Sequence, residues 1–290
     1  YLNDGMFVNA DVRELPQPMT ETDKIILQDK SINYRVLNLA SNTFNENETS
    51  YYHKSIGGYH AAKLRRYQEL IERYIHVEMQ QVMSAIVDAD GDMPAVSPEV
   101  SPVLNMLNAK YFILPMQGGS TAPLQNPHAM GNAWFVDKVT YSDNANEELD
   151  GMADIDLRHE AVADVKYKDI LGTSNVQDSL AEIHITKYAP NHLEYTANSA
   201  EGGVVVFSEI YYPGWQVLID GKPAELGRVN YVLRAVNVPA GKHDIVLDFH
   251  PQTLKITERM AYISYGVLLV ALLLIILRSV YQKKQIGKKK

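Results

Sequence analysis

An uncharged apolar run near the C-terminus constrains this chain more than any other feature. Residues 260–277 have the sequence MAYISYGVLLVALLLIIL. As a helix they span roughly 27 Å, close to the roughly 30 Å hydrocarbon core of a bilayer. Arg259 and Arg278 flank the run, where long basic side chains reach the membrane interface. A buried core helix is the alternative, but such helices rarely lack a polar face over this length. The run therefore predicts a transmembrane helix.

The residues around this run predict its orientation. Residues 278–290 form a basic tail without an acidic residue, whereas the whole chain carries a net charge of −8. The positive-inside rule places such a tail in the cytoplasm. We therefore expect the protein to be anchored in the inner, or cytoplasmic, membrane of the cell. Residues 1–259 would lie outside this membrane, in the periplasm or the extracellular space. Because the sequence starts at Tyr1 and residues 1–30 hold no apolar segment, we expect a signal peptide or earlier membrane helices upstream.

Composition and motifs exclude several function classes. The chain has no cysteine, which excludes a thiol nucleophile, a zinc ribbon and a disulfide scaffold. The negative net charge argues against a nucleic-acid partner. The nine histidines form no HExxH pattern, and no GxSxG, P-loop or GxGxxG motif occurs. We therefore assign no catalytic residue, no metal and no cofactor to this chain.

The first half of the chain mixes helical and extended patterns, and we predict an α/β domain over residues 1–145. Apolar positions recur at steps of three and four over residues 59–87, which predicts a long helix after Gly57-Gly58. A second helix is predicted over 97–108, with Ser97 as N-cap and Pro98 at the first helical position. Short apolar runs predict strands at residues 34–40, 110–114 and 132–136.

The second half changes to a period of two, which predicts an antiparallel β-sandwich over residues 152–255. Ile219-Asp220-Gly221-Lys222 predicts a type I′ hairpin, because Asp-Gly tolerates positive φ. The fold class expected for the whole chain is α+β, with one C-terminal transmembrane helix. The predicted strands cover residues 161–167, 181–188, 192–198, 204–210, 215–220, 231–238 and 244–250.

Two aromatic clusters are candidate ligand-binding sites. Tyr211, Tyr212 and Trp215 surround a Pro-Gly turn, and their rings either stack on sugar or lipid headgroups or fill the sandwich core, the simpler interpretation. Tyr59 and His60 follow two glycines before the long predicted helix. There the glycine amides either meet an anion at the helix N-terminus or belong to a plain entry loop, which is again the simpler interpretation.

An acidic loop resembles a calcium-binding register. Asp88, Asp90, Asp92 and Glu99 fall at its positions 1, 3, 5 and 12. Met93, however, occupies the place of the glycine that the sharp turn requires. An ordinary acidic loop after a helix is therefore the better interpretation.

Several phrases, in order along nearly the whole chain, resemble the C-terminal region of bacterial YfhO-like membrane proteins, particularly those of Bacteroidetes. The phrases are YRVLNLA at 34–40, SYYHKSIGGYHAAKLRRYQELI at 50–71, LNMLNAKYFI at 104–113, GNAWFV at 131–136 and SEIYYPGWQVLIDGKPAELGRVNYVLRAVNVPAGKH at 208–243.

The resemblance implies a polytopic glycosyltransferase of the GT-C type that uses polyprenyl-phosphate sugars in glycosylating the cell envelope. In that architecture the catalytic acid lies in an early outer loop among the N-terminal membrane helices, so no catalytic residue carries over to this chain. The chain would be the non-catalytic outer region plus the last membrane helix. Its partners would be the lipid bilayer, the remaining transmembrane helices of the full-length protein, and envelope glycan or the polyprenyl-phosphate sugar.

Two other hypotheses stay open on the sequence. A single-pass, membrane-anchored module that binds envelope carbohydrate without enzymatic activity fits the sandwich, the aromatic residues and the anchor. A free-standing hydrolase with paired carboxylates is weaker, because the sequence shows no pair held together in a cleft. The number of upstream membrane spans distinguishes the single-pass binding module from the glycosyltransferase.

Overall fold

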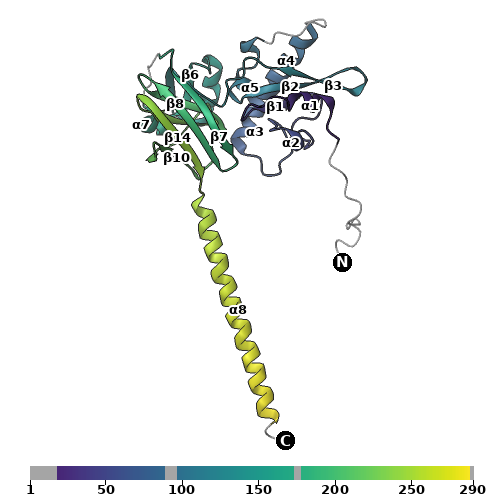
Figure 1. The fold of residues 1–290 in the computed structure, drawn as a ribbon, viewed down its shortest axis with the longest axis vertical. Helices are drawn as coiled ribbons and strands as arrows, with labels where there is room; N and C mark the ends of the chain where they lie inside the picture. Colours follow the sequence, from purple (N-terminus) through teal and green to yellow (C-terminus); the bar gives the residue numbers. More distant parts are fainter. Residues whose placement is uncertain (1–17, 89–96, 173–177, 288–290) are drawn as a thin grey trace.

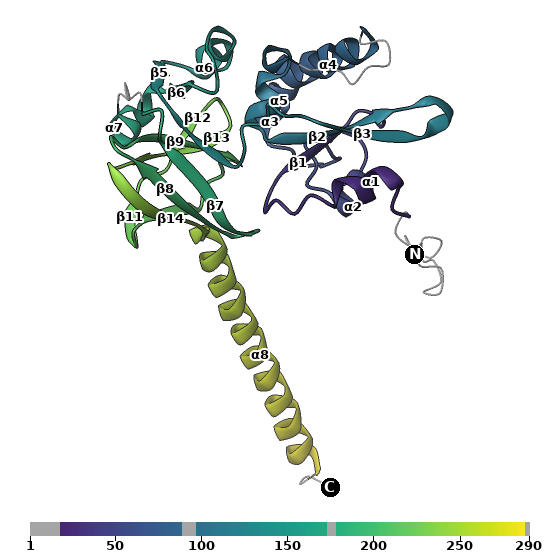
Figure 2. The same ribbon diagram turned by 45° about the horizontal axis from the view of Figure 1, so that its top comes forward.

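The computed structural model describes residues 18–88, 97–172 and 178–287 of the chain. Figure 1 shows two folded units side by side, with one long helix, α8 (Gln252–Gly287), projecting from the second. The same arrangement is visible in the turned view of Figure 2. Helices and three β-sheets occur together, and the predicted α+β class is confirmed.

A three-stranded sheet forms the centre of the first unit. Its order is β1-β2-β3, with β1 parallel to β2 and β2 antiparallel to β3. The predicted strands at 34–40 and 110–114 are present as β1 and β2. The sequence does not predict β3, because Pro123 interrupts its pattern; proline is tolerated at a sheet edge. The strands are β1 (Arg35–Asn38), β2 (Ala109–Pro115) and β3 (Thr121–Gln125).

Helices cover this sheet, and the longest begins later than the sequence predicts. The helix predicted over 59–87 starts only at Arg65, because Leu64 has an extended backbone. It then runs through a π-helical turn, Ile71–Ile75, to Asp88. Its inward face follows the predicted period, with Leu70, Ile75 and Val82 fully buried. The α-helices of the unit are α1 (Glu21–Ile26), α2 (Thr49–Tyr52), α3 (Arg65–Leu70), α4 (His76–Asp88) and α5 (Pro102–Met106).

The helix predicted over 97–108 is broken in two. A 3-10 turn, Pro98–Val100, is followed by α5, and the non-helical backbone of Ser101 separates them. Pro98 holds its predicted place at the start of the first turn. Ser97 holds the predicted N-cap position of this first turn, but its hydroxyl bonds the side chain of Glu99 instead of a backbone amide.

Two sheets form the sandwich of the second unit. The five-stranded sheet has the order β11-β10-β14-β8-β7, and the six-stranded sheet the order β4-β9-β13-β12-β6-β5. All seven strands predicted beyond residue 152 are present. The first sheet holds β7 (Glu182–Ala189), β8 (His192–Ser199), β10 (Trp215–Ile219), β11 (Lys222–Ala224) and β14 (Gly241–Phe249). The second holds β4 (Ala133–Val136), β5 (Lys138–Ser142), β6 (Glu160–Asp164), β9 (Gly203–Ile210), β12 (Gly227–Val229) and β13 (Leu233–Val238).

Local side chains and backbone angles set several strand ends. β6 stops at Asp164, three residues before its predicted end, because the Asp164 side chain accepts from the amide of Lys166 and starts a 3-10 turn. β13 begins only at Leu233, since Asn230 and Tyr231 both have positive φ. The predicted Asp-Gly hairpin is present, with φ of 51° at Asp220 and 75° at Gly221, as a type I′ turn requires.

The six-stranded sheet takes strands from both halves of the sequence. β4, predicted at 132–136 within the first domain, pairs with β9, and the unpredicted β5 pairs with β6. Two short helices, α6 (Ala145–Asp150) and α7 (Lys168–Leu171), connect strands of this unit. The domain limits 1–145 and 152–255 stay a prediction. We propose that the sandwich unit begins with β4.

The six-stranded sheet is buried on both faces, which ties the two units together. In β9, Val204 and Val206 belong to the core shared with the first unit, whereas Val205 and Phe207 belong to the core between the two sheets. Residues 204–209 are accordingly all buried, so β9 is apolar on both faces, as strands covered on each side are. Tyr195 of β8 closes the inter-sheet core with an edge contact to Phe207 at 5.0 Å.

The helix α8 follows the sandwich after only His250 and Pro251. Its segment Gln252–Ser279 is long and apolar enough to cross a membrane, and none of its apolar window is buried within the chain. It is the one such helix among residues that the structure describes. The transmembrane prediction at 260–277 falls inside it.

Candidate functional site

The predicted aromatic cluster lies where the sandwich meets α8. Trp215, at the start of β10, packs on Phe249, the last residue of β14, with ring centroids 5.3 Å apart. Tyr212 lies 6.1 Å from the same ring and is 48% exposed. Tyr211 is not part of this group and instead makes an edge contact with Tyr167 at 6.2 Å. The structure therefore brings two of the three predicted aromatic residues together.

The chain's own arginine occupies one face of Trp215. The Arg234 guanidinium lies 3.7 Å from the indole centroid, a cation–π contact, and Trp215 is partly buried in the inter-sheet core. That face is therefore closed to a sugar ring. Tyr212 remains as the predicted residue whose ring is open to solvent at this end of the sandwich. Binding of a ligand by these residues stays a prediction.

The second predicted cluster, Tyr59 and His60, precedes α3 without forming its N-terminus. Both residues are exposed, and the helix begins only at Arg65. His60 borders a hollow of about 290 Å³ that also reaches Ile210 at the end of β9. Tyr59 does not line this hollow. The two members of the cluster thus face different surroundings.

The amides of Gly57, Gly58 and Tyr59 are paired within the chain, which fits the simpler of the two sequence interpretations, an entry loop. The Gly58 amide donates to the Thr43 carbonyl at 2.7 Å, and the Tyr59 amide donates to the Glu46 carbonyl at 3.0 Å. Gly57 donates to the Ser55 hydroxyl. A Cβ on Gly57 would lie 2.0 Å from the Thr43 oxygen, so glycine is required here for a close backbone approach. These residues form an entry loop.

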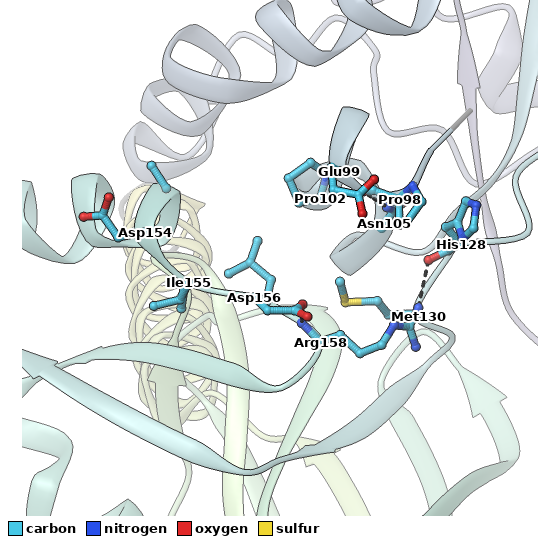
Figure 3. Close-up of a pocket in the computed structure, with 12 residues that line it drawn as sticks. Pro98, Glu99, Pro102, Asn105, His128, Met130, Asp154, Ile155, Asp156 and Arg158 are labelled. Carbon is cyan, nitrogen blue, oxygen red and sulfur yellow. Dashed lines mark hydrogen bonds between the residues drawn. The ribbon is translucent and has the colours of Figure 1, made fainter. Parts of the chain in front are cut away.

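A cavity that the sequence does not predict opens between the two units. Its volume is about 640 Å³, and Figure 3 shows residues of α5 and its preceding turn facing the loop before β6. Its polar groups are mixed in charge, with Glu99, Asp154 and Asp156 on the acidic side and Arg158 on the basic side. Arg158 donates to the His128 carbonyl at 3.0 Å. These residues are far apart in sequence, so no local pattern could reveal the cavity.

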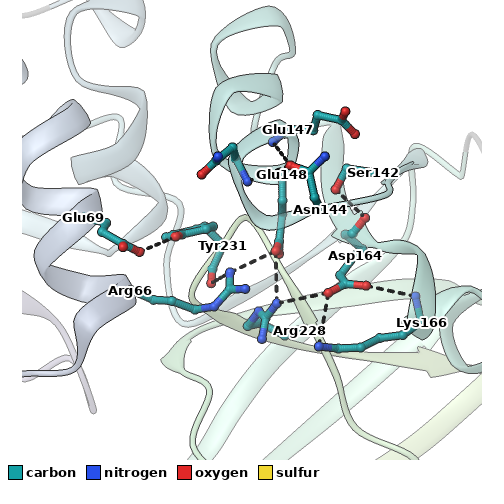
Figure 4. A network of polar contacts seen from close by, with 12 residues as sticks. Arg66, Glu69, Ser142, Asn144, Glu147, Glu148, Asp164, Lys166, Arg228 and Tyr231 are labelled. Carbon is teal, nitrogen blue, oxygen red and sulfur yellow. Dashed lines mark hydrogen bonds and ion pairs between the residues drawn. The ribbon is translucent and has the colours of Figure 1, made fainter.

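A buried carboxylate joins the two units on another side. Glu148 of α6 has no exposed surface, and its Oε2 accepts from Arg66 of α3 and Arg228 of β12, both at 3.0 Å. Figure 4 shows the three side chains converging from these elements. Tyr231 extends the network, because its ring lies 4.3 Å under the Arg66 guanidinium and its hydroxyl donates to Glu69. That hydrogen bond lowers the pKa of Glu69.

A second buried carboxylate caps a helix. Glu78 of α4 accepts from the Val103 and Leu104 amides, both at 2.8 Å, at the start of α5. Burial raises the pKa of Glu78 to about 7, and the two backbone hydrogen bonds oppose that rise. Carboxylates at helix N-termini are favoured by the unpaired amides and the helix dipole. Glu78 therefore holds α5 against α4.

The described residues contain no cluster of side chains that would support calcium binding or another metal site. Asp90 and Asp92 of the calcium-like register lie outside the described residues, as does Met93. Within residues 18–88, 97–172 and 178–287, no group of three or more histidine, aspartate or glutamate side chains is arranged to hold a metal ion. His159 and Glu160 form exposed ion pairs with Asp137 and Lys138.

In a comparison with known proteins, one family model matches part of the second unit. The model of the family "Bacterial membrane protein YfhO" matches residues 158–259, which include the strands from β6 to β14 and the first turns of α8. No curated protein and no solved structure matches the chain. Tyr211, Tyr212 and Trp215 lie inside the matched region, and Tyr59 and His60 outside it. Residues 158–259, the greater part of the sandwich and the first turns of α8, are thus similar to the bacterial membrane protein YfhO family, as the resemblance predicts.

Proposed function

We propose that this chain is the non-catalytic outer region of a polytopic membrane glycosyltransferase that uses polyprenyl-phosphate-linked sugars in cell-envelope glycosylation. One observation carries the proposal. The family match covers the strands from β6 to β14 and ends at Arg259, and the apolar run of α8 follows at once, so the matched region leads directly into a helix that is apolar enough to cross a membrane.

The architecture supports an outer region that is held firmly on its membrane helix. Only two residues separate β14 from α8, and the His250 amide donates to the Gly214 carbonyl at 2.8 Å. Gly214 has a φ of 109°, and a Cβ there would lie 3.0 Å from the Pro251 Cα. The turn before Trp215 therefore packs directly on the chain that enters the membrane. A region fixed in this way is suited to cap a bundle of membrane helices.

The exposed surface of α8 indicates what surrounds it. Its apolar side chains between Met260 and Leu277 are exposed in the chain itself, and such a surface is stable only in contact with lipid or with other membrane helices. A helix of this kind contacts the bilayer. We propose that the remaining transmembrane helices of the full-length protein cover part of it, and that residues 1–259 lie outside the membrane with the basic tail in the cytoplasm.

The complete coding sequence tests the proposal first. We expect several hydrophobic spans upstream of Tyr1, with an acidic residue in the first outer loop. A lone cleavable signal peptide there would contradict the glycosyltransferase and favour the alternative, a single-pass module that binds envelope carbohydrate without enzymatic activity.

The exposed ring of Tyr212 supports the alternative as well as the glycosyltransferase, because an open aromatic ring can stack on a sugar. Both hypotheses place envelope glycan near this end of the sandwich, so Tyr212→Ala in the full-length protein should weaken glycan binding or transfer about tenfold, the effect of losing one stacked ring. Tyr51→Ala is the matched control, because Tyr51 is 62% exposed on α2. Equal activity of the two variants would remove Tyr212 from the site.

A further inference from the structure

Charged residues, rather than apolar ones, close the sandwich at the end nearest α8. Val236 and Val238 of β13 fill the core between the sheets together with Phe207 of β9. Towards α8 the next residues are Arg234, which pairs with Phe207, and Glu209. Both are buried, Arg234 with 4% of its surface exposed. Burying charges at the end of an apolar core is costly unless they are paired.

The first unit adds two more cations to this place. Arg35 of β1 lies 3.1 Å from Glu209 and also donates to the Leu107 carbonyl at 2.9 Å. Lys54 donates to Asn33 at 2.7 Å, and its ammonium lies 3.2 Å from the centroid of the Tyr188 ring on β7. We refer to Arg35, Lys54, Arg234 and Glu209 as the basic cluster.

The charges of the basic cluster do not balance. Three cations face one carboxylate, and Glu209 already bonds Arg35 and Asn33. The Arg234 Nη1 is buried and has no hydrogen-bond partner within the part of the chain that the structure describes. Burial, opposed by the charge of Glu209 and assisted by that of Arg35, lowers the pKa of Arg234 to about 10 and that of Lys54 to about 8. A buried guanidinium donor without an acceptor is unusual.

The position of the basic cluster relates it to the membrane. Arg234 stacks on Trp215, and Trp215 pairs with Phe249, which only two residues separate from α8. Lys54 is an exposed residue, so the cluster meets solvent on the side that the first unit contributes.

We propose that the basic cluster is an anion site that binds a phosphate group, either free in solution or on the headgroup of a membrane lipid. Guanidinium groups offer forked donors that match phosphate oxygens, and an ammonium adds a mobile point charge. A bound phosphate supplies the missing acceptor for Arg234 and offsets the excess of positive charge. The inference rests on the charges of this chain and does not depend on glycosyl transfer.

Tryptophan fluorescence of the full chain in nanodiscs tests this site, because Arg234 lies on Trp215. The first arm titrates inorganic phosphate into chains held in phosphatidylcholine nanodiscs at constant ionic strength. The second arm compares those discs with discs that also contain phosphatidic acid. Lys54→Met is the test variant, Lys54→Arg the conservative one, and Lys242→Met the matched control, since Lys242 is exposed at the far end of β14.

We expect a saturable change in fluorescence that Lys54→Met weakens about tenfold or more, the worth of one charged hydrogen bond. Lys54→Arg and Lys242→Met should retain it. A response to inorganic phosphate identifies a free anion, and a response only to phosphatidic acid identifies a lipid headgroup. No response in either arm, or equal weakening by Lys54→Met and Lys242→Met, would show that the cluster is a structural ion network and overturn the site. Neither result bears on glycosyl transfer, which the coding sequence tests separately.

Discussion

At the scale of single residues, Glu148 makes the most consequential contact between the two units. Both Arg66 and Arg228 bond its Oε2, while its Oε1 and the Arg228 Nε have no partner among the described residues. Glu148→Gln keeps the shape but removes the shared counter-charge of the two guanidinium groups and leaves Arg228 with Asp164 alone, at 3.9 Å. Breaking a buried ion pair in this way costs about 3 kcal/mol of unfolding free energy.

Urea unfolding of the chain in detergent, followed by tryptophan fluorescence, measures that loss. Glu147→Gln is the matched control, because the neighbouring glutamate is exposed and surface changes alter stability by about 0.5 kcal/mol or less. Similar midpoints for the two variants would show that the network contributes nothing to joining the units.

At the scale of elements, the contact between α4 and α5 gives stability a particular pH dependence. The pKa of Glu78 rises from 4.5 in the unfolded chain to about 7 in the fold. The folded state therefore holds a proton that the unfolded state releases, and this contribution to stability is complete below about pH 4.5 and disappears as the pH rises to about 7. Its size is on the order of 3 kcal/mol.

Thermal unfolding of the wild-type chain and of Glu78→Gln at about pH 5 and about pH 8 isolates this carboxyl. We expect the wild type to lose more stability than the variant between the two pH values, because glutamine does not titrate. The same loss in both proteins would mean that Glu78 keeps an ordinary pKa.

The elements also show how far sequence reasoning reaches. Regular alternation specifies which side chains face the core, so β8 and β14 follow directly from it. The start of α3 does not, because the extended backbone of Leu64 delays it to Arg65. The Glu148 contact joins residues 82 positions apart, and nothing local distinguishes that glutamate from its solvated neighbours. The aromatic residues of the predicted site could be named from the sequence, but not the arginine that covers Trp215.

At the scale of the whole molecule, the proposed orientation across the membrane is open to a direct test, because the chain contains no cysteine. A single cysteine then reports one position with a membrane-impermeant maleimide in intact cells. Lys222→Cys places it beside the exposed Asp-Gly turn of the sandwich, and Gly287→Cys places it beyond the apolar run. With the sandwich outside, Lys222→Cys is labelled in intact cells, whereas Gly287→Cys is labelled only after permeabilisation. The wild-type chain, which has no thiol, is the control for both. The reverse pattern would place the sandwich in the cytoplasm, and it would contradict both the outer-region proposal and the positive-inside argument on which that orientation rests.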